Sequence, residues 1–149
     1  MILIADCGST KTDWVLCEGD DIIARARTQG LNPTHQESEE IFEILSTELT
    51  EEITAHNPQK IYFYGAGCAY ETANNRMRRA LESIFTTKEI EINSDLLAAA
   101  RALCKHEEGI ACILGTGPNS CLFDGEKIID NTPSLGYILG DEGSGAHLG

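Results

Sequence analysis

Three short apolar segments open the chain, and only turn-forming stretches separate them. The segments are residues 2–4, 14–16 and 22–24. The gaps at 8–13 and 18–21 contain glycine and aspartate, with serine and threonine in the first. Short apolar segments bounded by such residues are typical of strands joined by turns. The N-terminal region is therefore predicted to be a meander of three strands.

Helices and strands alternate after this meander. Apolar residues recur at helical spacing from Ile41 until Asn57 and Pro58, which predicts one amphipathic helix of about four or five turns that Ser38 can cap. The elements predicted beyond it are a strand at 61–64, a helix around 77–84, a strand at 89–92, a helix at 96–103, a strand at 110–114, and a hairpin of 121–123 with 127–129. The predicted order up to residue 103 is βββαβαβα.

The last residues combine a short apolar pair with several glycines. Ile138 and Leu139 are predicted as strand residues before the sequence GDEGSG at 140–145, and residues 143–145 indicate the start of a helix. The amides of a helix start need a following element, so a natural domain rarely ends there. We therefore expect the chain to be part of a longer protein.

Length and charge limit the class of protein. With 149 residues, 42% of them hydrophobic, the chain can bury one core, and a single domain over residues 1–149 is predicted, with 118–149 leading toward a second domain. The formal net charge is −13. This excess of acid repels phosphodiester backbones and anionic membrane surfaces, so neither nucleic acid nor membrane is an expected partner. A small anion such as a nucleotide can still bind through a local glycine loop and a cation.

The cysteines favour a reducing compartment. They are unevenly spaced, lack a CxxC pair and fall mostly within apolar segments, so we interpret them as reduced core residues of a cytoplasmic protein. The six are Cys7, Cys17, Cys68, Cys104, Cys112 and Cys121. The apolar residues 1–5 are too few for a secretory leader, and no segment approaches the length of a membrane span.

A hairpin-like segment at residues 6–13 is the first candidate for chemistry. The apolar strand delivers Asp6 to its end, where the carboxylate can hold Mg²⁺ through water. Gly8 allows backbone amides to approach phosphate oxygens, and Ser9 and Thr10 can donate hydroxyl hydrogen bonds. The segment is not a Walker A motif, because it lacks GxxxxGK[ST] and leads into a strand. A plain hairpin turn remains an equal alternative from these residues alone.

Two further segments have the same ambiguity. Residues 115–117, Gly-Thr-Gly, lie between two apolar strands and could approach an anion or form an ordinary turn. Residues 93–95, Asn-Ser-Asp, lie at a strand-to-helix junction, where any of the three could simply cap the helix.

The joint order of these segments resembles the first half of the actin-like ATPase superfamily. The segments DCGSTKTDW, NSDLLAAARAL, ILGTGPNSC and GYILGDEGSGAHLG are similar to the BadF/BadG/BcrA/BcrD group, over nearly all of the chain. The resemblance implies an α/β, RNase-H-like domain in which a three-stranded antiparallel meander joins parallel strands with flanking helices. It further implies ATP-dependent phosphorylation of an amino sugar, N-acetylglucosamine at its 6-hydroxyl, with ATP and Mg²⁺ as cofactors.

Roles for individual residues follow from the resemblance. Asp6 would be the acid associated with Mg²⁺, and Asp95 the general base that takes a proton from the attacking hydroxyl. The residues implied to bind phosphate are Gly8, Ser9 and Thr10 in the first loop and Gly115, Thr116 and Gly117 in the second. The residues implied to face the sugar are Asn119, Gly136 and Asp141. We expect Asp6, Asp95 and Thr116 to converge where a triphosphate would lie.

Some positions depart from the family pattern. Thr34 aligns with the family's sugar-binding asparagine, and Asn32 lies two residues earlier, so both are candidates for sugar binding. Pro118 replaces a hydrogen-bonding serine of some relatives. Lys11 could reach a phosphate or point to solvent, and Glu142 could cap a helix or act as a second acid. The identity of the sugar and the formation of a homodimer stay open.

Two other functions remain compatible with the sequence. One is the activator ATPase of a 2-hydroxyacyl-CoA dehydratase, which would need cysteines that hold a cluster between two subunits. Cys104, Cys112 and Cys121 are predicted in or beside core elements, which argues against that function. The other is a nucleotide-responsive binding module without sugar turnover.

Overall fold

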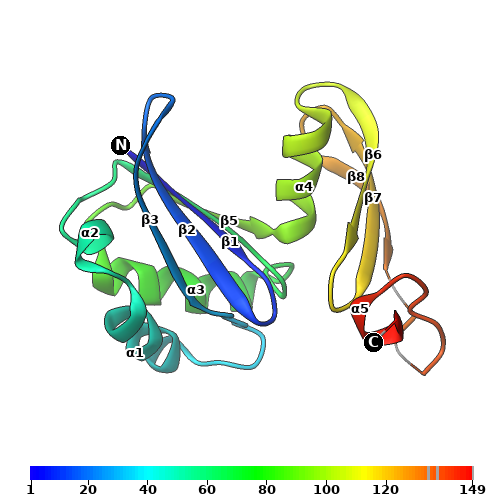
Figure 1. The fold of residues 1–149 in the computed structure, drawn as a ribbon, viewed down its shortest axis with the longest axis horizontal. Coiled ribbons are helices and arrows are strands. Elements are labelled where there is room, and N and C mark those ends of the chain that lie inside the picture. The colour runs from blue at the N-terminus through cyan, green and yellow to red at the C-terminus, as the bar shows by residue number, and fades with distance from the viewer. Residues whose placement is uncertain (134, 137, 149) are drawn as a thin grey trace. The chain divides into compact units, whose positions relative to one another are not determined.

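A computed structural model describes residues 1–133, 135–136 and 138–148 (Figure 1). Contacts within the chain divide it into two compact units, Met1–Asp95 and Leu96–Gly149. Each unit has its own hydrophobic cluster. The single domain predicted for residues 1–149 stays a prediction, because a compact unit of contacts is not by itself an independently folding domain.

The first unit contains a five-stranded sheet in the order β3-β2-β1-β4-β5. The strands β1 (Ile2–Cys7), β2 (Lys11–Glu18) and β3 (Asp21–Gln29) form the antiparallel meander. The strands β4 (Lys60–Gly65) and β5 (Ile90–Ser94) extend the sheet parallel to β1. This arrangement confirms the predicted meander joined to parallel strands.

Three helices contribute to the core on one side of this sheet: α1 (Ser38–Glu48), α2 (Glu51–Thr54) and α3 (Glu71–Ile84) (Figure 1). The prediction of one continuous helix up to Asn57 was wrong. The chain turns extended at Leu49, with ψ of 121°, before α2 begins. Leu49 and Ile53 are nevertheless both buried, so the apolar spacing continues across the break. Ser38 is the first helical residue and does not cap the helix.

Alternation along the strands places the core of the first unit. Every second residue of β1 and β2 is buried, including Cys7 and Trp14, as expected for a sheet covered by helices on one face. Trp14 packs against Phe63 of β4 with ring centroids 5.9 Å apart. On the less buried face, Tyr62 and Tyr64 stack at 6.4 Å.

The second unit contains a three-stranded antiparallel sheet in the order β6-β7-β8. Its strands are β6 (Glu108–Leu114), β7 (Pro118–Asp124) and β8 (Ile128–Pro133), and they confirm the predicted strand and hairpin. The helix α4 (Asp95–Cys104) starts at the junction of the units, and α5 (Gly145–Leu148) ends the described chain. The buried cluster of this unit comprises Leu96, Ala100, Ala111, Cys121 and Phe123.

Two predictions in the second unit were wrong. Ile138 and Leu139 lie in a turn and are exposed, with 94% of Ile138 accessible to solvent, because they contribute to neither sheet nor core. Cys112 is also exposed, since it lies on the face of β6 opposite the buried Ala111. The cysteines of the described chain are all free thiols, and Cys7, Cys68 and Cys121 are buried as predicted. No helix among the described residues is long and apolar enough to cross a membrane.

Candidate functional site

The carboxyl ends of three parallel strands bring Asp6 and Asp95 to one edge of the sheet. Cys7 pairs with Gly65, and Gly65 pairs with Ser94. Asp6 precedes the first residue of this row and Asp95 follows the last. Strands β1 and β5 lie on either side of β4, so their ends are roughly 10 Å apart. In open α/β sheets, this edge is where ligands bind.

The carboxylates of Asp6 and Asp95 both affect the pKa of the Cys7 thiol. Burial is the main cause that raises the pKa of this thiol, and the negative charges of Asp6 and Asp95 raise it further. Hydrogen bonds from Thr12 and Leu31 act in the opposite direction. The strand register places both carboxylates at this edge, and carboxylate oxygens are ligands that Mg²⁺ accepts.

The turn after Asp6 is a tight hairpin. The amide of Gly8 donates to the carbonyl of Lys11 at 2.9 Å, and Ser9 and Thr10 are exposed at the tip. The backbone of Gly30 lies directly against this turn. A Cβ at Gly30 would lie 2.5 Å from the carbonyl oxygen of Ser9, so only glycine fits without displacing the turn. The turn is thus supported from behind, while its tip faces solvent.

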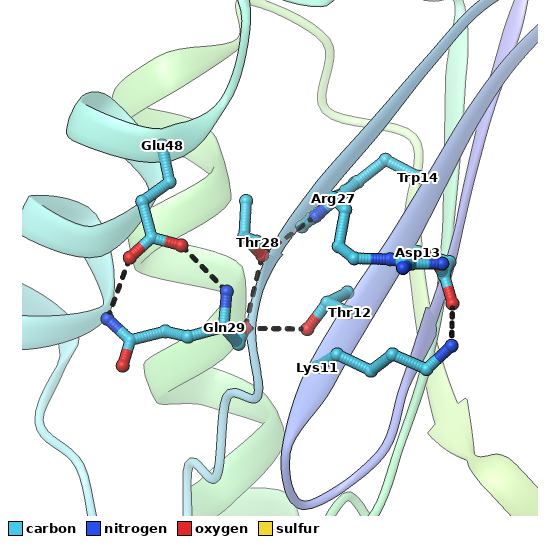
Figure 2. A network of polar contacts seen from close by, with 8 residues as sticks. All are labelled: Lys11, Thr12, Asp13, Trp14, Arg27, Thr28, Gln29 and Glu48. Carbon is cyan, nitrogen blue, oxygen red and sulfur yellow. Dashed lines mark hydrogen bonds and ion pairs between the residues drawn. The ribbon is translucent and has the colours of Figure 1, made fainter.

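Lys11 forms an ion pair with Asp13, a neighbour on the same strand β2 (Figure 2). Its Nζ pairs with Asp13 at 2.8 Å, and the Nε of Arg27 pairs with the other oxygen of Asp13 at 2.6 Å. Hydrogen bonds from Lys11 and then Arg27 hold the pKa of Asp13 below its ordinary value. In this arrangement the ammonium of Lys11 lies on Asp13, and its contact with a phosphate stays a prediction.

The end of β3 is fastened on both sides before the chain reaches Gly30. Figure 2 shows Gln29 against Glu48 of α1, with the Gln29 amide donating to Oε2 at 2.7 Å and its side chain donating to Oε1 at 3.0 Å. On the other side, Thr12 Oγ1 donates to the carbonyl of Gln29 at 3.1 Å. Trp14 Nε1 donates to Thr28 Oγ1 at 3.1 Å. These bonds fix where the following loop departs from the sheet.

The two candidate sugar-binding residues of this loop contact each other. The Thr34 amide donates to Asn32 Oδ1 at 3.0 Å, and Thr34 Oγ1 donates to the carbonyl of Gly67 at 3.2 Å. Gly67 has φ of +82°, and a Cβ there would lie 2.7 Å from Asn32 Oδ1. Asn32 is half-buried and Thr34 is exposed. The structure therefore brings both residues together at the end of β4, and their contact with a sugar stays a prediction.

In the second unit, two glycine-rich segments about thirty residues apart in sequence lie side by side. The Gly145 amide donates to the carbonyl of Gly115 at 2.7 Å, and the Ala146 amide donates to the carbonyl of Thr116 at 3.4 Å. The Gly115 amide donates to the carbonyl of Gly117 at 3.3 Å, which closes the turn. All three residues of the Gly-Thr-Gly turn are exposed. The GDEGSG segment thus supports the turn that resembles a second phosphate loop.

Two of the three residues implied to face the sugar from this unit also meet. Asp141 is 7% exposed, and its Oδ1 accepts a hydrogen bond from the Gly136 amide at 3.0 Å. Asn119 lies elsewhere, on β7, where its Oδ1 accepts from the Ser120 amide and from Asn131 Nδ2. Glu142 is exposed, and its carboxylate lies against Gly140. Asp141 therefore shapes the loop, and sugar contacts by Asp141, Gly136 and Asn119 stay predictions.

Metal binding at this edge stays a prediction, and Asp6 is the residue on which it depends. No group of three or more potential metal-ligating side chains occurs within the described part of the chain. Asp6 is exposed at the end of β1, beside the turn whose amides could receive phosphate. One carboxylate and a phosphate fit Mg²⁺, which keeps most of its water and takes few protein ligands.

Sequence reasoning missed two residues of the site. It interpreted Cys7 only as a core residue and did not single out Gly30. Cys7 accepts a hydrogen bond from the Leu31 amide, and Gly30 lies against the hairpin turn. The position of Cys7 between Asp6 and Gly8 was the available signal. Gly30 carried only the general signal of a glycine just before a turn.

Several solved structures are similar to this chain. A protein from Porphyromonas gingivalis, described provisionally as an N-acetylglucosamine kinase, matches 100% of this chain at 50% identity with a TM-score of 0.93. A Chromobacterium violaceum protein of the same provisional description matches 99% of the chain at 17% identity with a TM-score of 0.73. The chain has the actin-like ATPase fold.

The structural neighbours include sugar kinases of this fold. A ROK family glucokinase from Streptomyces griseus, solved with glucose and AMPPNP, matches 85% of the chain at 17% identity with a TM-score of 0.60. The chain spans about half of each protein, 53%, 53% and 46% of their lengths. No protein-family model and no curated protein matched the chain. The predicted fold class is confirmed.

Proposed function

We propose that the chain is part of an ATP-dependent kinase of the BadF/BadG/BcrA/BcrD group that phosphorylates the 6-hydroxyl of N-acetylglucosamine. The observation that carries the proposal is the shared sheet edge of Asp6 and Asp95, beside a glycine turn that Gly30 supports. The 50% identity to the Porphyromonas gingivalis protein supports the choice of sugar.

The roles divide among the residues by their chemistry. Phosphoryl transfer depends mostly on positioning and charge neutralisation, which ATP-bound Mg²⁺ supplies in part. Asp6 holds that cation through water. The hydroxyls and amides of Ser9 and Thr10, at the exposed tip of the turn, bind phosphate oxygens, and Gly8, whose own amide closes the turn, leaves room for the phosphate. In the second turn, Thr116 offers its hydroxyl to phosphate, and Gly115 and Gly117 let the backbone approach it. Asp95 orients the sugar hydroxyl and accepts its proton, a contribution of about 10²- to 10⁴-fold in rate.

Asn32 and Thr34 hydrogen-bond the sugar in this proposal. Their loop follows the segment that supports the phosphate turn, so the donor and acceptor sites share one framework. Asn119, Gly136 and Asp141 contribute further contacts. The sugar and ATP are the partners, and neither nucleic acid nor membrane is involved.

A coupled ADP-release assay tests the proposal on the complete protein. N-acetylglucosamine, N-acetylmannosamine, glucosamine and glucose are compared at equal concentration with ATP and Mg²⁺. We expect N-acetylglucosamine to give the highest kcat/KM, with the product phosphorylated at the 6-position by NMR. ADP release independent of every sugar, or nucleotide binding without turnover, would contradict the proposal.

A further inference from the structure

Arg76 of α3 reaches across to the loop that carries the candidate sugar-binding residues. Its Nη1 donates to the carbonyl of Pro33 at 3.1 Å and to that of Thr34 at 3.5 Å. Its Nη2 pairs with Glu37 Oε1 at 2.9 Å. Glu37 is the residue that precedes α1. One guanidinium thus connects α3 to the loop and to the start of the next helix.

The geometry of these contacts suits arginine better than lysine. The guanidinium is a rigid planar fork, so its two terminal nitrogens can serve two acceptors at once while keeping their relative positions. A lysine ammonium has one nitrogen on a flexible stem and cannot span both groups in the same way. Arg76 therefore fixes the separation between the Pro33 carbonyl and the Glu37 carboxylate.

The Arg76 contact is one of three hydrogen bonds that hold Thr34. Its carbonyl accepts from Arg76, its amide donates to Asn32 Oδ1, and its hydroxyl donates to the carbonyl of Gly67. The loop also closes on itself, because the amides of His35 and Gln36 both donate to the Asn32 carbonyl, at 3.0 and 2.9 Å. Removal of the Arg76 contacts leaves this loop without its link to α3.

We propose that Arg76 is a positioning residue for sugar binding: it contacts no substrate, but it holds the loop so that Asn32 and Thr34 present their polar groups to the sugar. This inference rests on the proposed function. Arg76 is 34% exposed and its partner Glu37 is 67% exposed, so the ion pair contributes little to global stability. Its effect is local to the loop.

Two other arginines on α3 provide a comparison. Arg78 donates to the carbonyl of Ile90 at 2.6 Å and so ties α3 to the scaffold of β5. Arg79 is exposed one turn from Arg76 and is the matched control for loss of a positive charge from the same helix. Arg76→Met and Arg79→Met remove the same charge and keep similar side-chain volume.

Steady-state kinetics of the complete protein provide the first test. Arg76→Met should raise the KM for the sugar about tenfold, the expected effect of losing hydrogen bonds from a charged donor. The KM for ATP and kcat should stay within about twofold, and Arg76→Lys should recover part of the loss. Arg79→Met should match the wild type. An unchanged sugar KM in Arg76→Met, or an equal rise in both KM values, would overturn the proposal.

Hydrogen exchange separates this inference from the proposed function. In Arg76→Met, the amides of His35 and Gln36 should exchange at least about tenfold faster than in the wild type, and those of β4 should not change. If the wild type is inactive but shows this exchange pattern, the kinase assignment is overturned, while the hold of Arg76 on the loop is confirmed. Unchanged exchange at His35 and Gln36 would show that Arg76 does not hold the loop, whatever the activity.

Discussion

Cys7 and Leu31 exchange two hydrogen bonds across 24 residues of sequence. The Leu31 amide donates to Cys7 Sγ at 3.2 Å, and the thiol donates to the Leu31 carbonyl at 3.1 Å. Both side chains are almost completely buried. The pair fastens the start of the candidate sugar loop to the strand end that carries Asp6. This buried contact therefore links the candidate sugar loop directly to the candidate phosphate turn.

Replacement of Asp95 by asparagine tests the general base. Asparagine keeps the size of the side chain but cannot accept the proton, so kcat of the complete protein should fall by about 10²- to 10⁴-fold. The affinity for ATP should change little, because Asp95 acts on the sugar hydroxyl. Coupled ADP release and nucleotide titration measure the two quantities. A variant that keeps more than about half of the wild-type rate would remove Asp95 from this role.

Replacement of Gly30 by alanine tests the support behind the phosphate turn. The new Cβ would lie 2.5 Å from the Ser9 carbonyl oxygen and 2.6 Å from that of Gly8, so the turn must move. Such overpacking should lower the free energy of unfolding by about 1–3 kcal/mol. Chemical denaturation of the complete protein measures this change.

The matched control is Gly117→Ala, since nothing lies within 4 Å of a Cβ at that position. Its free energy of unfolding should stay within about 0.5 kcal/mol of the wild type. Equal stability of both variants would show that Gly30 does not press on the turn. A loss of nucleotide affinity in Gly117→Ala without a loss of stability would support a phosphate role for that turn.

Asp13 should make stability depend on pH in the acid range. Its pKa is lowered in the folded state, so its ion pairs stabilise the fold above its ordinary value of 3.8 and lose this effect as the pH falls through the folded value. At neutral pH, Asp13→Asn should cost at most about 1 kcal/mol, because its partners are exposed and screened by solvent. Urea denaturation from pH 6 to pH 2 should show the difference from wild type disappear in acid. A difference that persists at pH 2 would assign the effect to packing.

The six thiols should react with iodoacetamide at very different rates. Cys112 is exposed, whereas Cys7 is fully buried and Cys68 is 3% exposed with burial raising its pKa to about 12. Because the thiolate is the reactive form, Cys7 and Cys68 should be modified only after unfolding. Peptide mass spectrometry of the native chain at pH 8 measures the order, and Cys112→Ser should remove the fastest phase. Early modification of Cys68 would show that its region opens readily.

Local patterns were sufficient to predict most elements of the fold. Alternation in β1 and β2 and the glycine and aspartate between them specify strands and turns within a few residues of sequence. The break after α1 was not predicted, because Leu49 and Ile53 are both buried and apolar spacing reports burial rather than backbone continuity. The strand predicted at Ile138 and Leu139 was wrong for a different reason. Two neighbouring apolar residues do not have to be buried, and these lie exposed in a turn.

The candidate site was only partly predictable. Asp6 and Asp95 were candidates because of their place in the order of segments and the family resemblance. The register brings the two residues to one sheet edge, and their roles stay predictions. The support behind the site could not be predicted, because its partners are distant in sequence. Arg76 lies 42 residues from the carbonyl of Thr34 that it contacts, and no local pattern encodes that pairing.

The outer strand of the second sheet has a consequence for handling the protein. Ile110 and Leu114 are 72% and 71% exposed on one face of β6, and within the described residues this strand pairs with β7 alone. An edge strand with exposed apolar side chains and unpaired backbone groups can pair with the same strand of another copy. The 149-residue chain should therefore sediment as growing assemblies as its concentration rises. The double substitution Ile110→Lys and Leu114→Lys should prevent this association. Unchanged sedimentation of that variant would show that another surface causes it.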